Sequence, residues 1–144
     1  MLNVKNVAHY ILTQVSTITT VKLQKLVYYS QAWSLAWDGV PLFNEEFQAW
    51  ANGPVCAELF DAHRGQFLIA ADDLAAYGNY KLSECEKETI DIVIETYNKY
   101  SSQQLSDMTH KERPWKEARG DLAPGERCHK VISKETMQDY YAGL

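Results

Sequence analysis

The sequence has no long apolar run and no paired cysteines. Polar residues such as Asn6 and His9 interrupt the apolar N-terminal stretch, so it lacks the continuous apolar segment of a signal peptide. No segment approaches the roughly 20 apolar residues that cross a bilayer. Cys56, Cys85 and Cys128 are odd in number and lie far apart, which disfavours a disulfide framework or a zinc ribbon. These absences predict a cytoplasmic protein with reduced thiols and no membrane association.

Catalytic motifs are absent as well. The chain contains no GxSxG, HExxH, P-loop or GxGxxG sequence. The nearest approach to a metal site is the set His63, His110, Cys128 and His129. A structural role is expected for His110, because a protonated histidine is favourable at the end of a helix. We therefore predict a protein that is not an enzyme, with no catalytic residue, metal or cofactor.

Charge is distributed unevenly along the chain. The net charge is −5, which argues against a protein that mainly neutralises nucleic-acid phosphates. Residues 1–37 contain three lysines and no acid, whereas residues 38–100 contain twelve acids against four bases. A segment so poor in charge either packs deeply or meets a partner.

Basic residues are frequent near the C-terminus, but acids interrupt them. The bases that accompany Trp115 are Lys111, Arg113, Lys116, Arg119, Arg127 and Lys130. The acids between them are Glu112, Glu117, Asp121 and Glu126. Because opposite charges cancel the field, binding to nucleic acid is not expected here.

Length and periodicity predict one mainly α domain over residues 1–144. Apolar residues make up 46% of the 144 residues, enough for one core. Helical spacing or capping signals predict helices at 3–15, from Thr19 or Thr20 to Gly39, from Pro54 to Phe60, at 84–100, from Ser101 or Ser102 to His110, and after Ser133. Residues 41–50 suggest a small β-hairpin or a turn followed by an extended arm. Residues 64–82 suggest a loop with one short element, and Pro114 should start a further turn.

Local side-chain pairs support two of these helices. Ser83 and Glu86 have the spacing of a capping box. Ile132 and Met137 flank the cap Ser133 at the spacing of a hydrophobic staple.

Aromatic residues are expected mainly in the core. The tryptophans are Trp33, Trp37, Trp50 and Trp115. Trp50 is assigned to this core, so Trp50→Ala should cost about 3 to 5 kcal/mol and unfold the domain or nearly so. Tyr28 and Tyr29 are adjacent on a helix, so they cannot both face one core, and one should be exposed or contact the next layer.

Four ordered blocks of sequence strongly resemble the Panacea domain of SocA-like antitoxins. They are KLQKLVYYSQAW at 22–33, GVPLF with EFQAW at 39–50, NGPV at 52–55, and LSDMTH at 105–110 followed by Pro114-Trp115. The resemblance covers most of the chain, from about residue 4 to about residue 141. The signature positions, expected to be structural, are Leu23, Lys25, Leu26, Trp33, Trp50, Gly53, Pro54, His110, Pro114 and Trp115.

The resemblance implies a helical antitoxin of a type II toxin–antitoxin system, frequently carried by phages or prophages and linked to phage defence. Such a protein neutralises a cognate toxin, encoded by an adjacent gene, by direct contact. Two alternatives remain open: a proteolytic adaptor that delivers the toxin to a cellular protease, and an uncharacterised enzyme of phage origin.

Partner contacts are expected where aromatic anchors or acidic charge are available. The acidic middle of the chain would attract a basic partner, and tyrosines often anchor interfaces. The resulting candidates are Tyr28, Tyr29, Glu45, Glu46, Asp72 and Asp73.

Overall fold

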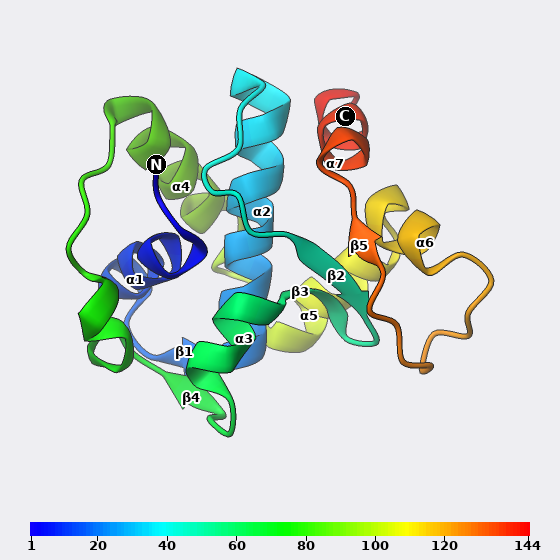
Figure 1. The fold of residues 1–144 in the computed structure, drawn as a ribbon, viewed down its shortest axis with the longest axis horizontal. Coiled ribbons are helices and arrows are strands. Elements are labelled where there is room, and N and C mark those ends of the chain that lie inside the picture. The colour runs from blue at the N-terminus through cyan, green and yellow to red at the C-terminus, as the bar shows by residue number, and fades with distance from the viewer.

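A single long helix, α2 (Thr20–Asp38), runs through the middle of the molecule, and the other elements surround it (Figure 1). The computed structural model describes all 144 residues. The Thr19 hydroxyl accepts a hydrogen bond from the Lys22 amide at 3.1 Å and so caps the start of α2. Gly39, with φ of 70°, ends it in a left-handed conformation. Both predicted ends of this helix are confirmed.

The low charge of residues 1–37 is explained by burial. Thirteen of the nineteen residues of α2 are buried, so this helix has almost no solvated face. Helix α1 (Val4–Val15) also turns its apolar stripe inward, as predicted. Of the two explanations that the sequence left open, deep packing therefore holds for α2.

Tyr28 and Tyr29 contact different layers on two sides of α2. The Tyr28 ring lies 5.2 Å from the Phe47 ring, and the Tyr29 ring stacks on Tyr97 at 4.1 Å. Their exposed fractions are 1% and 0%. Of the two expected outcomes, contact with the next layer is confirmed for both. Because α2 is covered on both sides, neither tyrosine is a surface contact for a partner, which corrects that assignment.

Three further helices cover α2 from the second half of the chain. They are α4 (Glu84–Tyr97), α5 (Ser102–His110) and α7 (Lys134–Ala142). The capping box of α4 is confirmed, because the Glu86 amide donates to the Ser83 hydroxyl and the Ser83 amide donates to Glu86 Oε1. These local signals placed the helices close to their observed bounds.

An extended strand lies within residues 41–50, as predicted, and it forms a hairpin whose second strand lies beyond residue 50. Strands β2 (Phe47–Trp50) and β3 (Gly53–Cys56) pair antiparallel, and β5 (Val131–Ile132) adds to the other edge of β2. Helix α3 (Ala57–His63) follows β3, so the prediction that a helix starts at Pro54 is wrong. Pro54 lies on an edge strand, where the missing amide hydrogen costs no ladder hydrogen bond.

Short elements complete the chain. Strand β1 (Ile18–Thr19) pairs with β4 (Leu68–Ile69), and the 3₁₀ helix η1 (Ala71–Tyr77) packs against α1. Pro114 lies at the start of a complete helix, α6 (Arg113–Arg119), where only a turn was expected. None of the helices has both the length and the apolar character needed to span a membrane.

The tryptophans are not all core residues. Trp115 is buried, whereas Trp33 and Trp50 are only partly covered. Trp37 is 49% exposed and stacks on Trp33 at 5.0 Å, so its predicted place in the core is wrong. It lies in the last turn of α2, beyond the layers that cover the middle of that helix.

Candidate functional site

The sequence blocks that carry the resemblance meet beside the first turns of α2. Lys25 is 1% exposed, and its Nζ atom donates a hydrogen bond to the Pro54 carbonyl at 3.1 Å. Gly53 has a φ of 116° and lies against the lysine stem. A Cβ atom at Gly53 would lie 2.6 Å from Lys25 Cε and 2.8 Å from Thr109 Oγ1. The close approach of the hairpin to α2 therefore requires glycine at this position.

Trp115 joins α6 to the same hairpin. Its indole nitrogen donates to the Trp50 carbonyl at 2.8 Å, and the His110 ring stacks on it at 4.1 Å. Burial lowers the pKa of His110, and its Nε2 atom is buried without a hydrogen-bond partner. Burial therefore works against the protonated form that was expected at the end of α5, because it favours the neutral ring.

Gln24, His63 and the backbone of Cys56 form a buried hydrogen-bond network next to Lys25. Gln24 Oε1 accepts from the Cys56 amide at 2.9 Å, and Gln24 Nε2 donates to the Cys56 carbonyl at 3.2 Å. These two bonds determine the orientation of the Gln24 amide, so its Nε2 also donates to His63 Nε2 at 3.0 Å. His63 must then accept through Nε2, and burial lowers its pKa accordingly.

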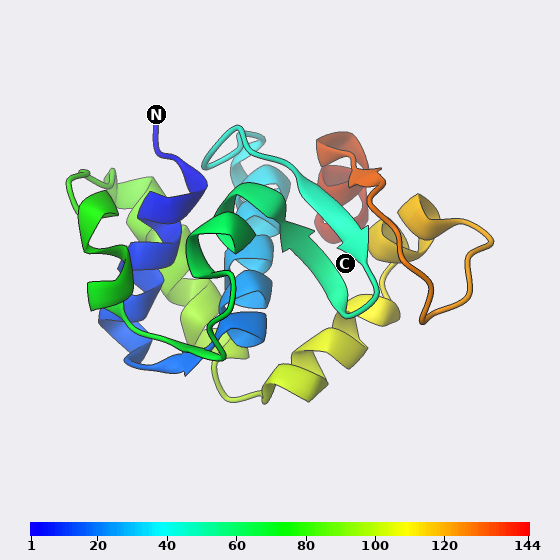
Figure 2. The same ribbon diagram turned by 60° about the horizontal axis from the view of Figure 1, so that its bottom comes forward.

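A pocket of about 480 Å³ opens next to this network. It is enclosed by the start of α2, the hairpin, α3 and the loop that precedes β5. Figure 2 shows α3 and the hairpin on the same side of α2. Its lining residues are Thr20, Val21, Gln24, Lys25, Trp50, Ala51, Asn52, Val55, Phe60, His63, Arg127, Cys128 and His129. None of them is acidic, although the whole chain has a net charge of −5.

Lys25 is a buried amine with an incomplete set of partners. An ammonium group has three donors, and Lys25 Nζ donates to one acceptor. None of the salt bridges in the molecule includes Lys25. Burial lowers its pKa to about 7, since no carboxylate compensates the lost hydration.

The candidate metal ligands divide between two places. His63, Cys128 and His129 line the pocket, whereas His110 packs on Trp115. No group of three or more histidine, cysteine or acidic side chains is arranged to hold a metal ion. Burial raises the pKa of the Cys56 thiol to about 12, which keeps it protonated.

Arg119 differs from the other C-terminal bases because it is buried, at 2% exposed. Its guanidinium donates to the carbonyls of Ala49 at 2.9 Å, Ala123 at 2.7 Å and Glu126 at 2.7 Å. It therefore fastens the segment after α6 to β2, and it does not belong to a surface patch. The sequence offered no signal for this role, since Arg119 stands among exposed bases.

The predicted acidic contacts fall in two separate segments. Glu45 accepts a hydrogen bond from the Val4 amide at 3.3 Å, and Asp73 accepts one from the Ala70 amide at 2.9 Å. Glu46 and Asp72 are exposed, and neither forms a salt bridge. Two of these four carboxylates thus serve helix starts, and two extend into solvent.

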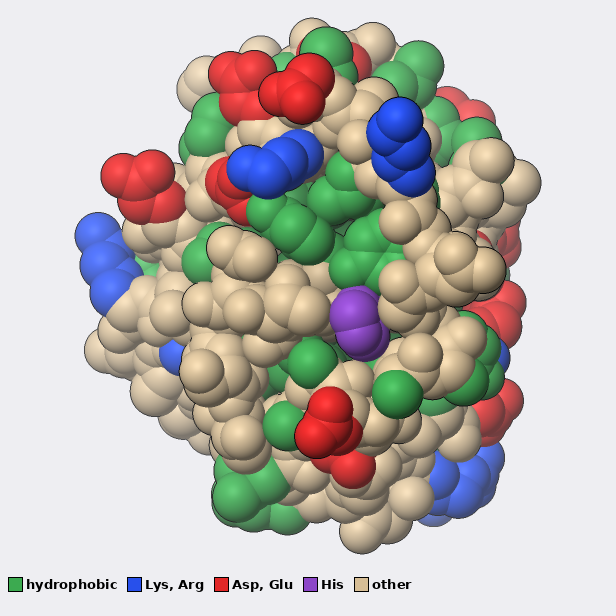
Figure 3. Space-filling view, turned by 90° about the vertical axis from the view of Figure 1, so that its left-hand side faces the viewer, with side chains coloured by type: hydrophobic (Ala, Val, Ile, Leu, Met, Phe, Trp, Pro, Cys, Tyr) green, Lys and Arg blue, Asp and Glu red, His purple; other side chains and the backbone are tan.

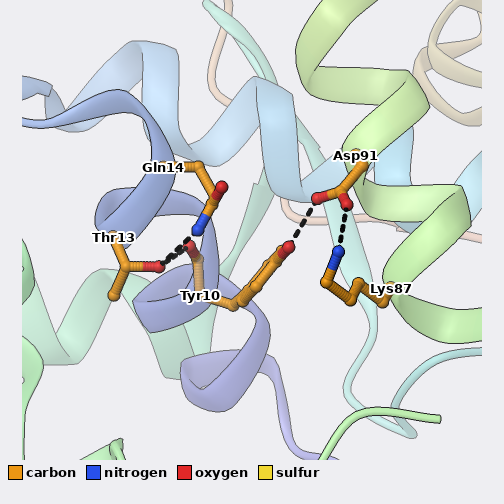
Figure 4. Close-up of polar contacts among 5 residues, drawn as sticks. All are labelled: Tyr10, Thr13, Gln14, Lys87 and Asp91. Atoms are coloured by element: carbon orange, nitrogen blue, oxygen red, sulfur yellow. Dashed lines mark hydrogen bonds and ion pairs between the residues drawn. The ribbon is translucent and has the colours of Figure 1, made fainter. Parts of the chain in front are cut away.

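A larger acidic surface lies on α4 and was not among the candidates. A shallow depression on its outer side is lined by Glu84, Lys87, Glu88, Asp91, Ile92 and Glu95; we call it the α4 face. Asp91 also accepts a hydrogen bond from the Tyr10 hydroxyl of α1 at 2.5 Å and pairs with Lys87 at 2.9 Å (Figure 4). The side of the molecule on which α1, η1 and α4 lie shows acidic and basic side chains in its upper part, apolar side chains and a histidine in the middle, and further acidic side chains below the histidine (Figure 3).

The pocket was not predicted as a unit. Gln24 belongs to the first block of the resemblance, and the sequence suggested His63 only as a metal ligand. The available signal was a glutamine and a lysine next to each other in a helix almost without charge. Arg127 and His129 offered no such signal, because only the fold brings them to the pocket rim.

Of the comparisons with known proteins, one finds a family. Neither the curated proteins nor the solved structures contain a match to the chain. A family model described as "Antitoxin SocA-like, Panacea domain" matches residues 23–116, a span that contains Lys25, the hairpin and Trp115. Because this match covers more than half of the 144 residues, the chain belongs to the family of SocA-like antitoxins with a Panacea domain.

Proposed function

We propose that this protein is the antitoxin of a type II toxin–antitoxin system and neutralises a protein toxin, encoded by an adjacent gene, through direct contact. The observation that carries the proposal is the family match over residues 23–116. A binding role also suits a molecule whose buried polar network is engaged in holding a hairpin to α2.

The α4 face is the contact surface that charge favours. Four of its six residues are acidic, and Ile92, 38% exposed, provides an apolar contact among them. Glu88 and Glu95 are exposed and lie two turns apart on the same side of α4, so a basic toxin surface can contact both. Complementary charge speeds association and disfavours acidic partners. Asp72, Asp73, Glu45 and Glu46 remain candidates for a wider contact.

Co-expression with the product of the adjacent open reading frame tests the function. If that product is toxic, this protein should restore growth and co-purify with it as a stoichiometric complex. Restored growth in a host that lacks its cellular proteases supports direct neutralisation. Rescue that disappears in that host identifies a proteolytic adaptor, and rescue at substoichiometric amounts with turnover identifies an enzyme; either outcome contradicts the proposal.

Charge reversal tests the surface. The double variant Glu88→Lys with Glu95→Lys should weaken toxin binding at least tenfold, because it replaces attraction by repulsion at one contact. The control Asp121→Lys with Glu126→Lys changes the net charge equally at exposed positions outside α4. Equal affinities of the two double variants would rule out the α4 face as the contact.

A further inference from the structure

A toxin contact on the α4 face does not account for the pocket beside Lys25. Its volume of about 480 Å³ lies within the range of roughly 300 to 1,000 Å³ that is usual for small-molecule sites. Such sites combine apolar walls with a few polar groups that orient the ligand. This pocket has both, and the charged side chains in its lining, Lys25 and Arg127, are basic.

Lys25, one of the lining residues of the pocket, has unused hydrogen-bond donors. Gln24 has both amide hydrogens engaged, whereas Lys25 has one acceptor for three donors. A buried cation without a counter-charge is costly. An anionic group bound next to Lys25 would supply the missing charge and the missing acceptors.

The rim adds cationic and imidazole groups. Arg127 and His129 are exposed and line the opening, and Arg127 forms no salt bridge within the chain. A guanidinium group binds phosphate or carboxylate oxygens in pairs. Because no acid lines the pocket, nothing there cancels the attraction between these groups and an anion.

Aromatic rings form one wall. Trp50 meets Phe60 edge to face at 5.0 Å and meets the His129 ring at 5.6 Å. The Trp50 indole nitrogen donates to Gln48 Oε1 at 2.8 Å, which holds the ring in place. Val21 and Val55 extend the apolar lining. A wall of this kind accepts a flat ring by stacking and by burial of apolar surface.

We propose that this pocket binds a small molecule that carries a flat ring and an anionic group, with its phosphate or carboxylate against Lys25 and Arg127 and its ring against Trp50. This ligand site is separate from the toxin contact, so it does not depend on the proposed antitoxin function.

Titrations followed by ¹H–¹⁵N NMR of the full chain test the site. Adenosine 5′-monophosphate represents a ring with a phosphate, and benzoate represents a ring with a carboxylate. We expect at least one of them to shift the amides of the pocket residues and to bind about tenfold more tightly than adenosine or inorganic phosphate. Whichever of the two binds more tightly identifies the anionic group. If neither shifts those amides, or if inorganic phosphate binds as tightly, the proposal is overturned.

Matched variants separate this site from unspecific attraction. Arg127→Ala should weaken binding of the tighter ligand about tenfold, while Lys130→Ala, an exposed base outside the lining, should not change it. Trp50→Leu should weaken it by a similar factor, whereas Trp37→Leu should have no effect, because Trp37 lies outside the pocket. Equal affinities within either pair of variants would overturn the proposal. Lys25→Met should reduce binding further, and circular dichroism establishes that each variant is folded.

Discussion

Lys25 couples the stability of the fold to pH. Its pKa is lowered by burial from 10.5 to about 7, so between these values the folded protein binds fewer protons than the unfolded chain. The free energy of unfolding should therefore rise by about 1.4 kcal/mol per pH unit from about pH 7 to about pH 10.5. Below pH 7 the amine is protonated in both states, so Lys25 adds no further pH dependence there.

Urea unfolding at pH 7, 8 and 9 measures this coupling. Lys25→Met keeps the length of the side chain and removes the titrating group, so its stability should gain on the wild type as the pH falls. Groups that titrate elsewhere affect both proteins and cancel in the difference. Parallel stability curves for the two proteins would show that Lys25 does not titrate in this range.

Gly53 combines a positive φ with a close contact, and three glycine variants separate the two effects. Gly125 has no positive φ, and a Cβ atom there would lie in open space, so Gly125→Ala should leave the stability nearly unchanged. Gly65→Ala has a φ of 84° and open space, and should cost about 1 kcal/mol. Gly53→Ala adds the collision with Lys25 and Thr109 and should cost roughly 3 kcal/mol or more. Thermal unfolding gives the order, and similar losses for Gly53→Ala and Gly65→Ala would contradict the close contact.

At the scale of elements, Arg119 should control the segment between α6 and β5. Arg119→Met keeps much of the volume but removes the donors to three carbonyls, of which that of Ala49 is buried, so it should cost about 3 kcal/mol. Limited proteolysis should then cut residues 120–130 faster than in the wild type. Lys116→Met, an exposed change on the same helix, is the control. An unchanged cleavage rate in Arg119→Met would mean that other contacts hold the segment.

The elements differ in how well the sequence predicts them, and the reason is locality. Helix α4 was predicted near its observed bounds because Ser83 and Glu86 satisfy its first amides within four residues. The second strand of the hairpin was not predicted, because Pro54 in isolation suits a helix start equally well. Only the pairing of β3 with β2 decides against a helix there. Pairings between distant segments leave no local signal of that kind.

In the candidate site, too, the sequence indicates single residues but not the contacts between distant segments. The resemblance singled out Lys25, Gly53 and Trp115 as separate positions, but their convergence depends on how the hairpin and α6 dock on α2. Tyr28 and Tyr29 were also named as partner contacts, because the sequence alone does not show that α2 is covered on more than one side. A helix covered by α4 on one side and by α7 on another has no solvent side at its centre.

At the scale of the whole molecule, the acidic charge of residues 38–100 should steer a basic partner. The association rate with the toxin should fall roughly tenfold from low to high salt, because ions screen the attraction. Stopped-flow measurements at several salt concentrations give this dependence. In Glu88→Lys with Glu95→Lys the dependence should become shallower, and a wild-type rate that is independent of salt would contradict electrostatic steering.

The enclosure of α2 also sets when the chain can fold during synthesis. The hydroxyl groups of Tyr28 and Tyr141 lie 3.1 Å apart although 113 positions separate them, and Tyr141 also donates to Glu112 Oε1 at 2.7 Å. A nascent chain that has not yet released α7 from the ribosome leaves one side of α2 open to water. The native core is therefore completed only when the last helix emerges, and we expect fragments that end before residue 134 to lack the proposed toxin binding.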